Sequence, residues 1–131
     1  MKRKLVVILV VMMLIISAGV IGIYKYIESN LGSVADADIT EINMAEIKDG
    51  VYNGSYSAFP VSAEVRVTVK DHSIMDIRIL KHINGQGAPA EIIIDRVMET
   101  QTLQVDSVSG ATYSSKVILH AIENALISKN N

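Results

Sequence analysis

A short stretch of small, hydroxyl-bearing and acidic residues stands between two segments with helical periodicity. It runs from Asp106 to Thr112 and reads DSVSGAT. Gly110 and Ala111 leave the backbone open to close approach by a flat or phosphorylated group. Thr112 stands where the next helix is expected to begin, so a phosphate bound there would meet free N–H groups and the positive end of the helix dipole. The stretch is therefore a candidate phosphate site, and the alternative is that Thr112 only caps the helix.

The same stretch resembles the attachment motif of the FMN-binding domain family, Asp-x-x-Ser-Gly-Ala-Thr. In that family a flavin transferase esterifies the Thr hydroxyl with the phosphate of FMN. Every fixed position of the motif is present here, at Asp106, Ser109, Gly110, Ala111 and Thr112. The resemblance extends upstream through Asp49–Gly54 and the Gly85–Pro89 loop, and so covers residues 49–126.

The resemblance implies a role for each residue of the motif. Thr112 would carry the phosphoester, and Ser109, Gly110 and Ala111 would shape the backbone around it. Asp106 would be the acid that the transferase requires.

Two flanking segments are further candidates to contact the flavin, the loop from His82 to Pro89 and residues Tyr113 to Ser115. The family is known for electron transfer beside a membrane, with redox proteins or quinone as partners. Some members are subunits of ion-pumping oxidoreductase complexes. This chain is shorter than those subunits, and that departure favours a stand-alone electron carrier. The sequence shows no proton-transfer constellation or substrate pocket, so a carrier is expected and not an enzyme. A membrane-tethered binding module without redox chemistry remains the alternative from another class.

The N-terminus carries a run of 19 apolar residues without a charge, from Leu5 to Ile23. As a helix it would span about 28 Å, close to the thickness of the hydrocarbon core of a membrane. Three basic residues, Lys2, Arg3 and Lys4, precede it. The positive-inside rule then predicts a cytoplasmic N-terminus and an extracytoplasmic domain. A cleaved signal peptide is the alternative, but the apolar run continues past the small residues Ser17 to Gly19.

Composition excludes several kinds of site. The chain has no cysteine, so disulfides, Cys-ligated metals and iron–sulfur clusters are excluded. Its three histidines are isolated in the sequence, which argues against a metal site. After the apolar run, nine Lys and Arg stand against all fourteen acids, a net charge of −5. An acidic domain without a basic block argues against nucleic acid as a partner.

Between the apolar run and the domain, the apolar residues show no sustained helical or strand periodicity. We interpret residues 1–24 as a cytoplasmic stub and membrane anchor, 25–48 as a tether, and 49–131 as the FMN-binding domain. A short helical turn is expected near Glu41 to Ile47. The alternative for the tether is that Ile39, Ile42 and Ile47 pack on the domain as an N-terminal arm.

The domain begins with residues that are typical of strands. Val51 to Ser57 is predicted as a strand, in which Gly54 indicates a bulge or a close backbone approach. Val61 to Lys70 alternates completely between apolar and polar residues, as in a half-buried antiparallel strand. Ile74 to Leu80 returns after a turn in which His72 is expected at positive φ.

Helical patterns follow the strands. One helix is predicted to begin at Pro89, with an acidic, solvated stripe at Glu91, Asp95 and Glu99. Leu103 to Val105 is a candidate short strand, and Tyr113 to Ile127 is predicted as the last helix. Strands followed by helices indicate an α+β fold: an N-terminal transmembrane helix, then an antiparallel meander of three to four strands packed with two helices.

Overall fold

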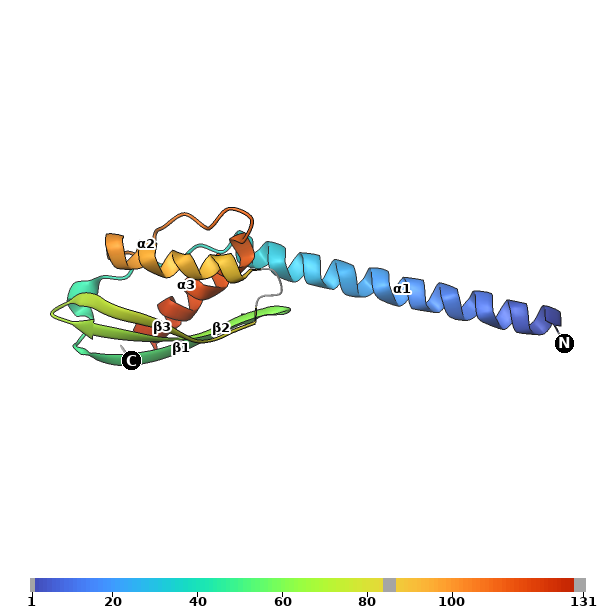
Figure 1. The fold of residues 1–131 in the computed structure, drawn as a ribbon, viewed down its shortest axis with the longest axis horizontal. Coiled ribbons are helices and arrows are strands. Elements are labelled where there is room, and N and C mark those ends of the chain that lie inside the picture. The colour runs from blue at the N-terminus through green and yellow to red at the C-terminus, as the bar shows by residue number, and fades with distance from the viewer. Residues whose placement is uncertain (1, 84–86, 129–131) are drawn as a thin grey trace.

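The computed structural model describes residues 2–83 and 87–128. A long helix, α1 (Lys2–Ala35), projects from a small domain whose sheet has the order β1-β2-β3. The three antiparallel strands are β1 (Gly50–Ala58), β2 (Val61–Lys70) and β3 (Ser73–Ile83). The long helix α3 (Thr112–Ile127) packs on one face of the sheet, and α2 (Ile93–Thr100) lies beside β3 (Figure 1). The predicted α+β class is confirmed.

The alternation in β2 decides which face of the sheet is covered. Its five apolar residues are all buried, whereas the residues between them are exposed or half-buried. Val65 and Val67 are completely inaccessible to solvent, because α3 lies directly over this face. The opposite face carries Glu64 and Arg66, and it remains open to solvent.

The two hairpin features that the sequence predicted are present. Asp71 and His72 have φ angles of 51° and 59°, so the predicted positive φ of His72 is confirmed. Two consecutive positive φ values define a tight turn whose twist matches that of the flanking strands. Gly54 marks a close backbone approach: a Cβ atom there would collide with the carbonyl oxygen of Ala121 and lie 2.7 Å from the Cα atom of Ala125. Its missing side chain lets α3 lie close to β1.

Of the two alternatives for the segment after the apolar run, the structure shows the packed arm. Helix α1 continues without a break to Ala35. Beyond it, Ile39 and Ile47 are 8% and 2% exposed, and Ile42 packs against the same core. The expected helical turn is the short 3-10 helix η1 (Met44–Glu46). The division of the chain into anchor, tether and domain at residues 24 and 48 stays a prediction.

A buried polar cluster fastens this arm to α3. The amide of Thr40 donates to Oε1 of Glu123 at 2.8 Å, and Oε2 of Glu123 lies 2.7 Å from Nδ1 of His120. The His120 ring stacks on Tyr56 with 4.7 Å between centroids. Burial raises the pKa of Glu123, but the hydrogen bonds from Thr40 and His120 outweigh it and hold that pKa below its ordinary value. The carboxylate is therefore ionised and accepts hydrogen bonds from both sides.

The segment between the sheet and α3 opens with a helical stretch, as expected: Pro89 lies in the first turn of the 3-10 helix η2 (Ala88–Ile92), and α2 follows it directly. The other expectation for this segment is wrong. Leu103 to Val105 is not a strand. Leu103 is buried in the core, and the side chain of Gln104 donates to the carbonyl oxygen of Ile39 at 2.6 Å. This segment thus pairs with the N-terminal arm and not with an edge of the sheet.

Candidate functional site

The Asp106–Thr112 motif ends in a tight turn immediately before α3. The amide of Ala111 donates to the carbonyl oxygen of Val108 at 2.9 Å, which closes a four-residue turn. Gly110, the third residue of that turn, has a φ angle of +78°, as a type II turn requires. A Cβ atom at Gly110 would meet nothing within 4 Å, so the space beside this backbone is open.

Ser115 stabilises the turn from its buried side. It is completely buried, and its Oγ atom accepts from the amide of Val108 at 2.9 Å and donates to the carbonyl oxygen of Ala111 at 2.8 Å. Ser115 is among the residues that the sequence predicts to contact the flavin, whereas its described contacts are with the backbone of the motif. A signal in the sequence points to this role: Ser115 shares the apolar face of the helix with Ile118 and Ile122.

Arg96 holds the other end of the motif and was missed at the sequence level. Its Nη1 atom donates to the carbonyl oxygens of Asp106, at 2.7 Å, and Ser107, at 3.3 Å. These bonds fix the backbone and leave the carboxylate of Asp106 exposed. The sequence carries no local signal for this contact, because Arg96 lies on α2, ten residues before Asp106.

Thr112 is the first residue of α3, and its side chain is exposed. The capping position belongs to Ala111, and no side chain in the described part of the chain caps this helix. The alternative in which Thr112 serves only as the helix cap is therefore wrong. Intrahelical bonding begins with the amide of Ser115, which donates to Ala111 at 2.9 Å. The three preceding amides, of Thr112, Tyr113 and Ser114, have no intrahelical acceptor.

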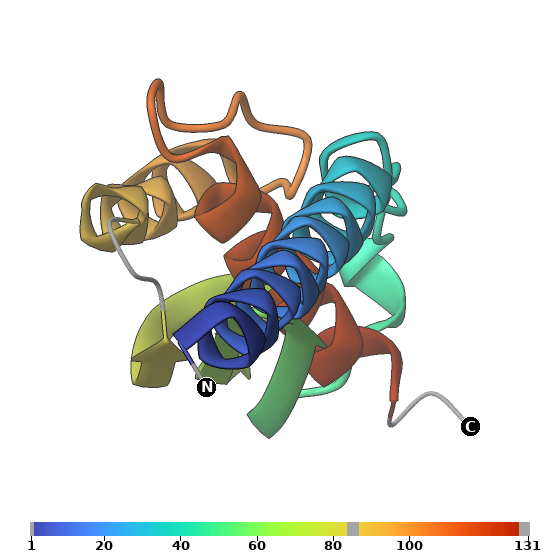
Figure 2. The same ribbon diagram turned by 90° about the vertical axis from the view of Figure 1, so that its right-hand side faces the viewer.

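The five motif residues thus form one continuous site. Asp106, Ser109, Gly110 and Thr112 are exposed, while Ala111 is buried and anchors the turn in the core. An exposed hydroxyl, an open backbone beside Gly110 and uncapped amides of a 16-residue helix suit a phosphate ester chemically. The site begins α3 at the end of the domain where α1 joins it (Figure 1; Figure 2 views this end).

The flanking residues that are candidates to contact the flavin differ in their exposure to solvent. Tyr113 is 41% exposed beside Thr112, whereas Ser114 is buried. The side chain of His82 is 2% exposed, and its Nδ1 atom lies 3.0 Å from Oε1 of Glu91. Residues 84–86 of the predicted contact loop lie outside the described residues. Of these candidates, Tyr113 is therefore the one whose side chain both adjoins Thr112 and reaches solvent.

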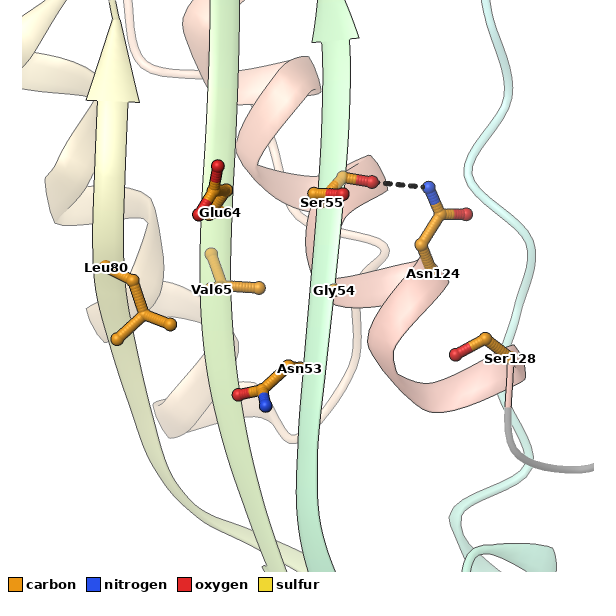
Figure 3. Close-up of a pocket in the computed structure, with 8 residues that line it drawn as sticks. All are labelled: Asn53, Gly54, Ser55, Glu64, Val65, Leu80, Asn124 and Ser128. Atoms are coloured by element: carbon orange, nitrogen blue, oxygen red, sulfur yellow. Dashed lines mark hydrogen bonds between the residues drawn. The ribbon is translucent and has the colours of Figure 1, made fainter.

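A separate hollow lies far from the motif, at the β1 side of the sheet. It has a volume of about 340 Å³ and is lined by polar residues such as Asn53, Glu64 and Asn124 and by the apolar residues Val65 and Leu80 (Figure 3). Asn124 bonds the carbonyl oxygen of Ser55 at 2.9 Å. Because Asn124 is twelve residues after Thr112 on α3, the hollow lies about 18 Å from the motif along the helix axis. It shares no residue with the motif.

Comparison with known proteins settles the family. Residues 60–127 match the model of the FMN-binding domain, a span that includes β2, β3 and the entire motif. The chain belongs to the FMN-binding domain family. The predicted resemblance is confirmed, and FMN is the cofactor that this family membership supports.

Two proteins that are similar in sequence to this chain are much longer than this chain. An NADH:acrylate oxidoreductase of Vibrio harveyi is 31% identical over 110 residues, which cover 79% of this chain and 11% of that protein. An uncharacterised protein of Treponema pallidum is 31% identical over 85 residues, which cover 63% of this chain and 24% of the relative. The chain thus spans about a tenth and about a quarter of these relatives. The oxidoreductase and the family together support a flavin-binding electron-transfer domain.

Proposed function

We propose that this protein is a membrane-anchored electron carrier outside the cytoplasm, with FMN esterified through its phosphate to Thr112. One observation carries the proposal: an exposed, unengaged Thr hydroxyl begins an uncapped helix inside a complete attachment motif. FMN supplies reversible one- and two-electron chemistry, so the protein has only to hold, orient and tune it. A covalent link also prevents loss of the cofactor by dilution outside the cell membrane.

The structure suggests how each motif residue serves attachment. Arg96 and Ser115 fix the backbone on either side of the turn, so that the Thr112 hydroxyl is presented at one position. The exposed carboxylate of Asp106 remains accessible to a flavin transferase. Ester formation would be a substitution at phosphorus: the Thr112 hydroxyl would lose its proton, its Oγ atom would bond to the phosphorus of FMN, and the P–O bond from that phosphorus to the leaving group of the flavin donor, a nucleoside monophosphate where the donor is a flavin dinucleotide, would break. The amides of Thr112, Tyr113 and Ser114, which have no intrahelical acceptor, would be available as donors to that phosphate.

The anchor is proposed from α1. The segment Arg3–Ala35 is the one helix of the described chain that is long and apolar enough to cross a membrane, and its apolar window is entirely exposed. Length and composition would also suit a leader sequence. The basic residues Arg3 and Lys4 at its start favour a cytoplasmic N-terminus.

A second candidate function is a flavin subunit of a larger oxidoreductase complex. It is favoured by the relative from Vibrio harveyi, in which a similar segment makes up 11% of an enzyme named as an NADH:acrylate oxidoreductase. In that case the chain would exchange electrons with a separate catalytic subunit. Both candidates require redox-active FMN on this domain, with redox proteins or quinone as partners.

Covalent flavin is the first expected result. When the chain is made in a host that exports an active flavin transferase, the denatured protein on a gel should fluoresce as flavin. Its intact mass should exceed that of the chain by FMN less one water, on the peptide that contains Thr112. The same chain made without the transferase is the control, and an unmodified protein from both hosts would contradict the proposal.

We expect the anchor to remain uncleaved and its N-terminus to lie in the cytoplasm. Protease added outside intact cells should digest the domain and leave a membrane-bound stub that contains α1. The physical reason is the cluster of basic residues before Leu5, which resists transfer across the membrane. A mature N-terminus near Ala18 or Gly19 would show instead that the segment is a cleaved signal peptide.

A further inference from the structure

The domain is fixed to α1 and does not hang from it on a loose linker. The side chain of Asn30 donates to the carbonyl oxygen of Phe59 at 2.9 Å. One residue later, Leu31 packs against the core of the domain, and Val34 is 3% exposed. Because α1 is unbroken from Lys2 to Ala35, the distance between its apolar run and the domain is set by helix geometry.

That distance is short. Asn30 follows Ile23, the last residue of the apolar run, by seven residues, which is about 10 Å along a helix. The headgroup layer on one side of a membrane is about 5–8 Å thick. With Leu5 to Ile23 in the hydrocarbon core, the bond between Asn30 and Phe59 would lie only a few ångströms beyond the headgroups. The ring of Phe59 is exposed and is therefore available to contact that layer.

Phe59 has the properties of a residue that meets a membrane surface. It lies in the two-residue turn between β1 and β2, at the end of the domain where α1 joins (Figure 1). It is the single phenylalanine of the chain, and it is 59% exposed. Tyr24 and Tyr26, just beyond the apolar run, are 67% and 64% exposed. Tyr is enriched at the level of the lipid headgroups, and Phe is among the residues that interfacial segments bury at the boundary between headgroups and acyl chains.

We propose that the β1–β2 turn rests on the headgroup layer of the membrane that α1 crosses, with Phe59 as the contact residue. This inference depends on the membrane anchor proposed above. The contact gives the domain a second point of attachment beside α1 and restricts how it can tilt. Since α3 begins at the same end of the domain, this orientation would place the start of α3, and with it Thr112, on the side of the domain nearer the bilayer (Figure 1). A flavin there would be reached most directly by a lipid-soluble or membrane-embedded redox partner.

The absence of tryptophan from the chain gives a direct test. Three single-tryptophan variants of the full chain are made without a flavin transferase: Phe59→Trp, Tyr24→Trp and Val51→Trp. Val51 is the matched control, since it is 53% exposed but lies at the opposite end of β1, about 27 Å from Phe59. Each variant is reconstituted into phosphatidylcholine–phosphatidylglycerol vesicles, with or without bromine on the acyl chains near the headgroup. Bromine quenches tryptophan that comes into contact with it.

In the brominated vesicles the Phe59→Trp variant should lose about half of its emission and shift to shorter wavelength, as interfacial tryptophans do. The Tyr24→Trp variant should be quenched at least as strongly, and the Val51→Trp variant should not change. Strong quenching of Tyr24→Trp with none of Phe59→Trp would overturn the docked orientation and leave the anchor standing. No quenching of Tyr24→Trp would overturn the anchor and the docking together. Neither outcome depends on the flavin.

Discussion

Replacing Thr112 by valine is expected to abolish flavin incorporation while leaving the fold intact. Valine keeps the branched shape of threonine but has no hydroxyl to form the phosphoester. The side chain of Thr112 is exposed and makes no hydrogen bond among the described residues, and the cap position belongs to Ala111. The expected loss of stability is therefore about 1 kcal/mol or less, as for other surface substitutions. Flavin fluorescence of the denatured protein and its thermal melt should be measured on the same sample.

Thr112→Ser is the matched control, because it retains a hydroxyl at the same backbone position. It should fold normally and accept flavin at least in part. Electron transfer from the membrane should follow flavin content through this series and not melting temperature. Covalent flavin on the Thr112→Val protein would move the attachment elsewhere, with Ser109 as the nearest exposed hydroxyl of the turn. A folded, flavin-free variant that still transfers electrons would contradict the carrier function.

Sequence alone was sufficient where the signal is local. The strict alternation of Val61 to Lys70 predicted β2 to the residue, since a period of two has no other regular explanation. The Asp71-His72 turn follows equally from residues adjacent in the chain. The turn and helix start before α3 were predictable for the same reason, because Gly110, Ala111 and Thr112 are consecutive; that these residues hold the flavin stays a prediction.

Features that depend on distant contacts were not predictable. The apolar run ends at Ile23, yet α1 continues to Ala35, because Leu31 and Val34 pack against the core of the domain. The same applies to Leu103–Val105, where Gln104 pairs with Ile39, 65 residues earlier. At the site, Arg96 reaches the motif from a separate helix. No local pattern encodes such pairings, since they form only when the chain is folded.

The largest effect on stability is expected from Val65→Asp. Val65 is completely buried between the sheet and α3, at the centre of β2, and it pairs with Gly54 on one side and Ile79 on the other. Among the described residues, no Lys or Arg is buried in the core, and the buried His120 is already paired with Glu123. Burying an unpaired charged group costs several kcal/mol, which approaches the total stability of a small domain. The variant should therefore be unfolded or protease-sensitive at room temperature.

Thr68→Asp introduces the same carboxylate on the open face of the same strand and is the matched control. Thr68 is half-buried and lies opposite Asp76 on β3, so repulsion between like charges should cost about 1 kcal/mol or less. The two variants are compared in detergent by protease resistance of the domain as a function of urea. Wild-type resistance of Val65→Asp would mean that α3 does not cover this face. Equal damage in both would mean that the face carrying Thr68 is also covered, for instance by a partner protein or a membrane. The difference in protease resistance between the two variants thus measures how much more deeply one face of the sheet is buried than the other. The buried face is the one that α3 covers, and α3 begins at Thr112.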